Sequence, residues 1–215
     1  MFIFYFVFDV LFARGIPNFL AFLLTGLTMW HWMQSTIVQC GNSIASNRSI
    51  IQQVLVPKAL FPSVIVLANF VKFLFVLVIL IVFLLSYGIE PSWGWLYTLP
   101  ILAVTILLLS GMGFLLAAVV PLFPDIRVLI DNGFRAVFFL SGIFYDIASM
   151  PANIATLLGF NPFAVLISAF RNALLTGTPP DILKLFSIFL FSVATLVLGL
   201  IIMRKKRSSY AKALI

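Results

Sequence analysis

The chain has 215 residues, of which 63% are hydrophobic and 9% are charged, and its mean hydropathy is +1.22. Soluble domains contain roughly 25% charged residues, so this composition excludes a soluble globular protein and indicates an integral membrane protein. The apolar residues form long runs instead of alternating with polar ones, which predicts an all-α fold and not a membrane β-barrel.

The net charge of +7 does not indicate a nucleic-acid-binding protein, because the basic residues flank the apolar runs and form no continuous basic stripe. One cysteine, Cys40, excludes an internal disulfide and a cysteine metal cluster. The one histidine, His31, lies between two tryptophans, and we expect it to form interhelical hydrogen bonds. We therefore expect no catalytic residue, no metal site and no cofactor site in this chain.

Six apolar stretches predict six transmembrane helices, since about 20 apolar residues are needed to cross a bilayer as a helix. The predicted spans cover residues 1–13, 19–39, 63–87, 95–120, 132–148 and 182–203. The first is short and begins without a polar entry, so we expect the sequence to start inside its first span; a short, tilted or re-entrant segment is the alternative. The fifth is also short and needs its flanks or a thin bilayer.

Between the second and third spans, a short amphipathic helix is predicted over about residues 47–56. Its apolar positions Ile50, Ile51, Val54 and Leu55 follow a helical spacing. Ser46 or Asn47 would cap it, and Pro57 would end it. This helix is either a simple membrane-surface helix or a docking element for a soluble partner.

The segment of about residues 150–178, before the last span, is apolar but interrupted by prolines and glycines. Two short helices, near Ala152–Leu158 and Pro162–Leu175, fit between the interruptions. Neither is long enough to cross a bilayer. We expect them to enter the outer leaflet and return, shielded from lipid by protein.

The orientation follows from the basic residues, because lysine and arginine are enriched in cytoplasmic loops. Five of them follow the last span: Arg204, Lys205, Lys206, Arg207 and Lys212. With this tail inside, Arg48, Lys58, Arg127 and Arg135 also lie inside, while Arg14, Arg171 and Lys184 lie outside. The C-terminus is therefore predicted to be cytoplasmic.

Two aromatic and polar stripes are candidates to line a transport path. On the first span, the stripe comprises Phe2, Tyr5, Asp9 and Phe12; on the fifth, it comprises Phe134, Phe138, Ser141 and Tyr145. Sugar rings stack on aromatic faces and polar tips bond their hydroxyls, although packing between helices or facing lipid is the alternative role of these phenylalanines. At the inner turn, Asp125, Arg127 and Asp131 are candidates for a cytoplasmic gate, and plain anchoring of a helix end is the alternative.

Several segments resemble the permeases of ABC transporters that export polysaccharide and polyol phosphate. The run from Ser46 to Lys58 resembles their coupling-helix segment, with Gln52 and Gln53 where basic character is usual and Lys58 in place of arginine. The other similar segments are Gly15-Ile16-Pro17-Asn18, Trp30, Phe123-Pro124-Asp125-Ile126-Arg127, Asn161-Pro162-Phe163 and Phe170-Arg171-Asn172-Ala173-Leu174-Leu175.

This resemblance implies a homodimer in the bacterial cytoplasmic membrane, paired with two copies of an ATP-binding subunit, that exports lipid-linked glycans such as O-antigen, capsule or teichoic acid precursors. The sequence has no phosphate-binding loop, so ATP and Mg²⁺ would be bound by the partner. The residues expected to contact it are Asn47, Ile50, Ile51, Val54, Pro57 and Lys58. Export of drugs or small lipids by a similar permease, a membrane-embedded transferase and a purely structural membrane protein are the alternative functions.

Overall fold

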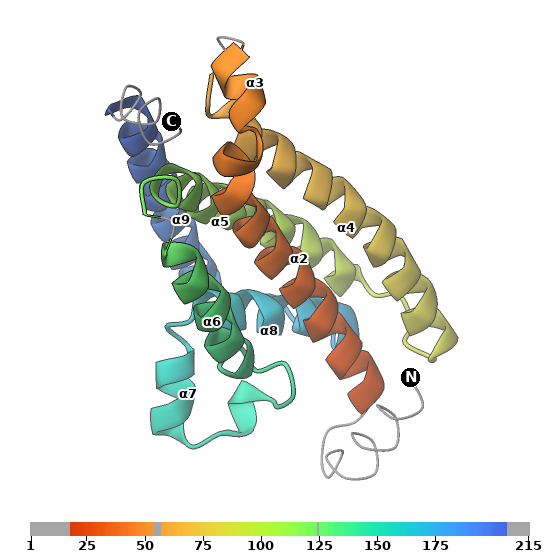
Figure 1. Cartoon of the computed structure of the whole chain (residues 1–215). Coiled ribbons are helices and arrows are strands. Elements are labelled where there is room, and N and C mark those ends of the chain that lie inside the picture. The colour runs from red at the N-terminus through yellow and green to blue at the C-terminus, as the bar shows by residue number, and fades with distance from the viewer. Residues whose placement is uncertain (1–17, 54–56, 124, 206–215) are drawn as a thin grey trace.

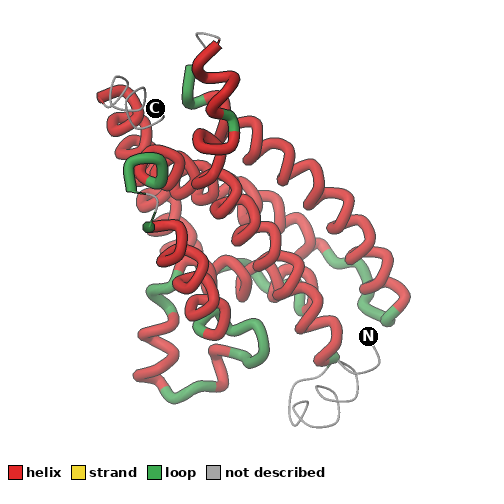
Figure 2. The backbone as a smooth tube through the Cα atoms, in the orientation of Figure 1, coloured by secondary structure: helices red, strands yellow, loops and turns green. Residues whose placement is uncertain are grey.

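The computed structural model describes residues 18–53, 57–123 and 125–205, and in these ranges its regular elements are all helices, joined by loops and without a strand (Figures 1 and 2). The α-helices are α2 (Phe19–Ser46), α3 (Arg48–Gln53), α4 (Leu60–Ser86), α5 (Thr98–Val119), α6 (Ile126–Phe139), α7 (Ala152–Leu158), α8 (Pro162–Leu175) and α9 (Ile182–Lys205). Two short 3-10 helices are η2 (Trp93–Tyr97) and η3 (Ile147–Ser149). The all-α prediction is confirmed for the described residues, and the first predicted span lies outside them.

The helix α5 lies at the centre of the bundle, in contact with α2, α4, α8 and α9. Its contact with α9 is close because glycines face the partner helix: a Cβ on Gly111 would lie 2.6 Å from the carbonyl oxygen of Ser192, and one on Gly199 would lie 2.7 Å from the backbone nitrogen of Leu115. Small residues allow such close approach between membrane helices, where dispersion contacts replace the hydrophobic effect as the packing force.

Three helical segments are long and apolar enough to cross a membrane: Leu60–Ser86, Trp93–Val119 and Ile182–Lys205. The most apolar part of the middle one is 56% buried within the chain, against 22% for each of the other two, whose exposed apolar faces suit lipid. These segments coincide with the third, fourth and sixth predicted spans. The helix α2 has 28 residues but is less apolar, because polar side chains such as His31 and Gln34 interrupt it.

The fifth predicted span, 132–148, differs from the structure. The helix α6 has 14 residues, begins at Ile126 and ends at Phe139. It stops early because the chain turns at Gly142, which adopts a left-handed φ of 65°. It starts earlier than predicted. Arg127 and Asp131 were assigned to the inner turn from their charge, but they lie within the helix. At about 1.5 Å per residue, such a helix is too short to cross a bilayer alone.

The two short helices predicted before the last span are confirmed, with the predicted bounds. The helices α7 and α8 are bent by 101° relative to each other, as in a broken span or a re-entrant loop. The segment was expected to be shielded from lipid by protein, and Leu166, Ile167 and Phe170 of α8 are fully buried. The segment is therefore part of the core.

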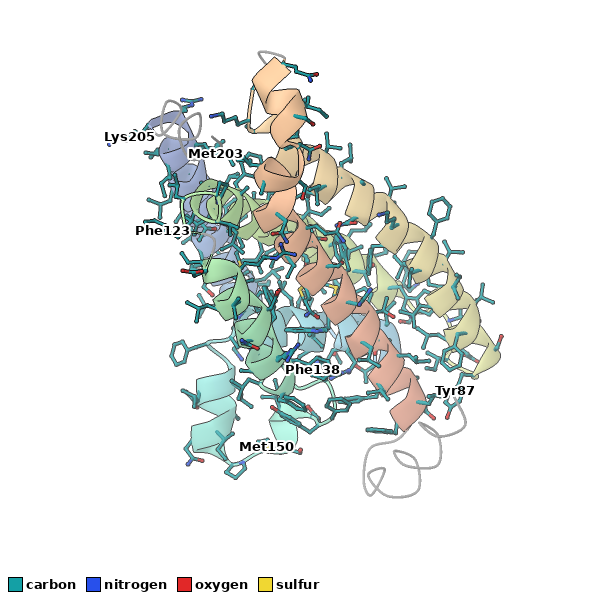
Figure 3. All side chains as sticks on the ribbon, in the orientation of Figure 1. Tyr87, Phe123, Phe138, Met150, Met203 and Lys205 are labelled. Atoms are coloured by element: carbon teal, nitrogen blue, oxygen red, sulfur yellow. The ribbon has the colours of Figure 1, made fainter. Side chains whose placement is uncertain are left out.

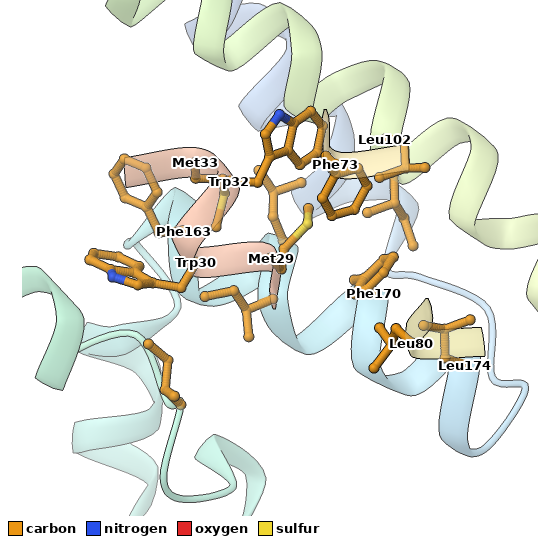
Figure 4. Packing of buried hydrophobic residues seen from close by; sticks show 14 of the residues in the cluster. Met29, Trp30, Trp32, Met33, Phe73, Leu80, Leu102, Phe163, Phe170 and Leu174 are labelled. Atoms are coloured by element: carbon orange, nitrogen blue, oxygen red, sulfur yellow. The ribbon is translucent and has the colours of Figure 1, made fainter. Parts of the chain in front are cut away.

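The core centres on one face of α2 (Figure 4). The rings of Trp32 and Phe73 stack with their centroids 4.1 Å apart, and Phe73 in turn lies 6.3 Å from Phe170 of α8. Between α2 and α4, the Nδ2 atom of buried Asn69 donates to Gln39 Oε1 at 3.0 Å. Interhelical polar contacts of this kind fix the relative position of membrane helices.

The predicted amphipathic helix is present in part: α3 covers Arg48–Gln53, and Val54 lies outside the described residues. In Figure 1, α3 and the C-terminal end of α9 lie at one end of the molecule, and α7 lies at the opposite end. We call these the α3 end and the α7 end.

Candidate functional site

A cavity of about 540 Å³ lies between α2 and α6. We call it the wide pocket. From α2 it is lined by Leu27, Trp30, His31 and Gln34, and from α6 by Phe134, Arg135, Phe138 and Phe139. Ligand pockets typically have volumes of about 300–1,000 Å³, so the wide pocket is large enough for a sugar residue.

One face of α2 forms a wall of the wide pocket, because Leu27, Trp30, His31 and Gln34 recur at spacings of three and four residues. The indole Nε1 of Trp30 donates to Gln34 Oε1 at 2.9 Å. This bond uses one lone pair of the Gln34 amide oxygen and leaves its Nε2 atom as a donor. His31 is exposed and makes no hydrogen bond to another described side chain, so the interhelical bond expected for it is not formed.

Aromatic rings give the α6 wall its shape. The centroid of Trp30 lies 6.0 Å from that of Phe134, 5.5 Å from that of Phe138 and 5.9 Å from that of Phe163 on α8. Phe138 also meets Phe139 edge-on, with centroids 5.3 Å apart. Such offset and edge-to-face pairs hold the rings in fixed orientations. Figure 3 shows Phe138 near the C-terminal end of α6.

Along α6, the positions 127, 131, 135 and 139 form one row at four-residue spacing, occupied by Arg127, Asp131, Arg135 and Phe139. Arg127 and Asp131 line a second cavity of about 10 Å³, the narrow pocket, which also includes Asn42 of α2. The row therefore runs from the narrow pocket into the wide pocket. Arg135, which its charge placed in the inner loops, instead lies in the last turns of α6.

The predicted charge network at the inner turn is not formed in this structure. The ion pair found within the described ranges is a different one, between Lys184 and Asp181, with the nitrogen and oxygen 3.7 Å apart. Asp125, Arg127 and Asp131 are exposed and take part in no ion pair among those residues. The spacing on α6 allows the Arg127–Asp131 contact, but both side chains extend toward the cavity and solvent instead. Their role as a gate stays a prediction.

The predicted stripe on the fifth span is shorter than expected. Phe134 is buried and Phe138 lines the wide pocket, but Ser141 and Tyr145 lie beyond the end of α6 and no longer share a helical face with them. The Ser141 hydroxyl donates to the carbonyl of Val137 at 2.6 Å, and the Tyr145 hydroxyl donates to that of Phe139 at 2.9 Å. The first-span candidates Phe2, Tyr5, Asp9 and Phe12 lie outside the described residues.

Arg171 of α8 is the side chain that fixes the position of the α6 wall. The sequence analysis assigned it to the outer loops and to a segment that resembles the permease family, without a structural role. It is 3% exposed. Its Nε donates to the carbonyl of Phe22 at 3.0 Å, its Nη1 to that of Gly142 at 3.1 Å and its Nη2 to that of Ile143 at 3.3 Å. The guanidinium carbon lies 3.4 Å from the centroid of the Phe22 ring, a cation–π contact.

Asn161 reinforces this link between α8 and the end of α6. Its Oδ1 accepts from the backbone N–H of Phe163 at 3.0 Å and so caps α8, with Pro162 in the first turn. Its Nδ2 donates to the carbonyl of Leu140 at 3.2 Å and to Ser141 Oγ at 3.3 Å. Through Asn161 and Arg171, the loop that follows α6 is held on α8. A charged residue within an apolar, non-spanning helix was the sequence signal for this site.

At the α3 end, the structure shows part of the predicted contact segment for a partner. Ile50 is 46% exposed, and Pro57 is exposed. Asn47 Nδ2 donates to the carbonyl of Ser43 at 2.8 Å, at the junction of α2 and α3. Lys58 is half-buried, and the side chain of Ile51 lies outside the described part. An exposed apolar residue on a short helix at one end of the molecule suits a docking element.

Residues 1–175 match the family model of the ABC-2 type transporter. The chain belongs to the ABC-2 type transporter family. It is 28% identical over 214 residues to the O-antigen export system permease protein RfbA of Klebsiella pneumoniae, covering 99% of this chain and 82% of that protein. It is 23% identical to the RfbA protein of Myxococcus xanthus, over 100% of this chain and 83% of that protein. It is 22% identical to the polysialic acid transport protein KpsM of Escherichia coli, over 94% and 80%.

Proposed function

We propose that this chain is the permease subunit of an ATP-driven exporter that moves lipid-linked polysaccharide outward across the bacterial cytoplasmic membrane. The family membership gives the transport class, and the printed names of the similar proteins favour a glycan of the O-antigen or capsule type. Two copies of the chain would pair with two copies of an ATP-binding subunit, which would bind ATP and Mg²⁺. The C-terminus and α3 would then lie in the cytoplasm.

The observation that carries the proposal is the polar and aromatic character of the groove between α2 and α6. On the exposed side of α6, Arg127, Asp131, Asn132 and Arg135 are polar residues of a helix in a membrane protein. Charged side chains facing lipid are costly, so such a face requires water, protein or a polar substrate. A hydrated groove with aromatic walls suits a sugar chain, whose rings stack on aromatic faces while its hydroxyls bond polar groups.

The driving force would enter at the α3 end. The helix α3 directly follows α2, one wall of the groove, so a rigid displacement of α3 by an ATP-binding subunit would be transmitted along α2. The α6 wall is held on α8 by Arg171 and Asn161. A movement of α2 against this anchored wall would change the width of the groove.

The polar residues of the wide pocket favour a glycan over the alternative substrates. A pocket for hydrophobic drugs or small lipids is lined mainly by apolar groups with few polar ones. Here the wide pocket contains an arginine, a histidine and a glutamine among its eight lining residues. This composition favours a hydroxyl-rich or charged substrate over a purely apolar one.

Inactivation of the chromosomal copy in the native bacterium tests the proposed function. The expected result is loss of surface polysaccharide, detected with an antiserum or lectin, and accumulation of lipid-linked polysaccharide inside the cell. A plasmid copy of the chain restores the surface glycan. Unchanged surface polysaccharide in the inactivated strain, together with sensitivity to hydrophobic drugs, would contradict the proposal and favour drug export.

A further inference from the structure

We propose that the wide pocket is a binding site for an anionic group of the substrate, a phosphate or a carboxylate, held by Arg135, His31 and Gln34. This inference rests on the proposed function and specifies which chemical group of the glycan or of its lipid linkage the groove would recognise. Three observations support this site: the polar groups that line the pocket, the hydrogen-bond donors among them that remain available, and the fixed orientation of the aromatic walls.

Each of the three polar residues that line the wide pocket offers a hydrogen-bond donor, and one of them is a cation. Arg135 offers five N–H groups and no acceptor, and His31 offers at least one ring N–H. Gln34 contributes its Nε2, while its Oε1 accepts a hydrogen bond from Trp30 at 2.9 Å. No aspartate or glutamate is among the lining residues. A site rich in donors and without a carboxylate selects a ligand that presents acceptor oxygens, above all a charged one.

Arg135 is available for such a ligand. It is exposed, and it takes part in no ion pair or hydrogen bond among the residues that the structure describes. Asp131, one turn earlier on α6, is its nearest acidic neighbour in the row but lines the narrow pocket instead. A guanidinium in a membrane protein is costly to maintain without a partner or water. The planar, bidentate geometry of arginine matches phosphate and carboxylate oxygens.

The rest of the pocket would orient the ligand. Trp30 packs against Phe134 and Phe138, and its hydrogen bond fixes the Gln34 amide, so the Gln34 donor is held in place before a ligand arrives. Phe139 is 63% exposed at the edge of the pocket and offers a ring face to an adjoining sugar. An anionic group at the donors and a sugar ring against Phe139 would together occupy the pocket.

Two sources present this chemistry: the phosphate that links a glycan to its lipid, and an acidic sugar unit within the chain. Titration calorimetry of the full chain in detergent separates them, with inorganic pyrophosphate and glucuronate as probes and glucose as the neutral reference. Saturable binding of at least one anion, but not of glucose, is expected. Pyrophosphate alone would assign the lipid linkage, glucuronate alone the acidic sugar, and both would assign a general anion site.

The deciding variant is Arg135→Gln, because it removes the charge of an exposed side chain without disturbing the packing. It should weaken anion binding roughly tenfold or more, since a charge-assisted hydrogen bond is lost. The matched control is Arg204→Gln, the same change at an exposed residue in the last turn of α9 and outside the wide pocket, which should leave the affinity unchanged. Absence of saturable binding, or equal weakening by both variants, would overturn the inference.

Failure of this inference is distinguishable from failure of the proposed function. If the inactivated strain loses its surface polysaccharide but the purified chain binds neither anion, only the anion site is wrong. If the surface polysaccharide is unchanged in that strain, the proposed function itself is wrong, whatever the calorimetry shows.

Discussion

Replacement of Arg171 by lysine tests the structural role of the one buried cation in the described part of the chain. The guanidinium donates from three different nitrogens to the carbonyls of Phe22, Gly142 and Ile143, at 3.0, 3.1 and 3.3 Å. These acceptors belong to α2 and to the loop after α6, and the guanidinium bridges them because its nitrogens point in different directions. A lysine keeps the positive charge but has a single nitrogen, which reaches only one side of this cluster.

The expected loss of stability follows from the bonds that lysine cannot replace. Two of the three hydrogen bonds are lost, and a bond to a charged group contributes about 1.5–3 kcal/mol in water-soluble proteins but about 0.6–2 kcal/mol within membranes. The free energy of unfolding should therefore decrease by about 2–4 kcal/mol. For a chain of this size, 1 kcal/mol corresponds to roughly 2–4 °C in melting temperature, so we expect a decrease of roughly 5–15 °C.

The assay is thermal unfolding of the purified protein in detergent, followed by loss of the monodisperse peak in size-exclusion chromatography. The matched control is Arg204→Lys, the same substitution at an exposed residue in the last turn of α9, where a change within about 0.5 kcal/mol is expected. If Arg171→Lys melted at the same temperature as this control, the three carbonyl bonds would contribute nothing measurable, and the anchoring of α6 on α8 by this residue would be refuted.

Two further predictions concern packing and coupling. Gly26→Ala would place a methyl group against the terminal nitrogen of Arg171, so it should destabilise the protein by about 1–3 kcal/mol in the same thermal assay. The control is Gly133→Ala, where no atom lies within 4 Å of the added Cβ. This change should be neutral or should stabilise α6 by up to about 1 kcal/mol. Equal effects of the two alanines would contradict the close contact. Ile50→Asp should uncouple ATP hydrolysis by the partner subunit from export of surface glycan while leaving membrane insertion intact. The same apolar-to-acidic change at Leu60, in the first turn of α4, is the control, and normal surface glycan with Ile50→Asp would remove the docking role of α3.

The sequence predicted well those elements that depend on local pattern. Long apolar runs gave α4, α5 and α9 within a few residues, and proline positions gave both short helices before the last span. The predicted start of α6 was wrong because its residues Arg127 and Asp131 are charged, and hydropathy assigns charged residues to loops. Its end at Phe139 depends on acceptors that residues of α8 satisfy, about 20–30 positions later in the chain. No local pattern carries that information.

The candidate site shows the same division. Phe134 and Phe138 were predicted to line a transport path from their spacing on a helix. Both line the wide pocket, and their role in transport stays a prediction. Ser141 and Tyr145 were placed on the same stripe by extending the helix too far, and they lie in the loop that follows it. His31 and Gln34 were not predicted as pocket residues. Which residues line a cavity between two helices depends on how the helices are rotated relative to each other, and the sequence of one helix does not determine that rotation.

The sequence by itself determined that the chain is an all-helical membrane protein, because hydropathy and helical periodicity are properties of neighbouring residues. The family was indicated separately, by the resemblance of short segments to known permeases. Only the tertiary structure decided which polar residues meet. Arg171 reads as a topological charge in the sequence, yet it joins α2, α8 and the end of α6 in the fold. Arg135 reads as an inner-loop charge, yet it faces a cavity beside Trp30 and Gln34. The physical reason is that a buried or groove-facing charge is positioned by hydrogen bonds and packing between distant segments, and these contacts exist only once the helices have assembled.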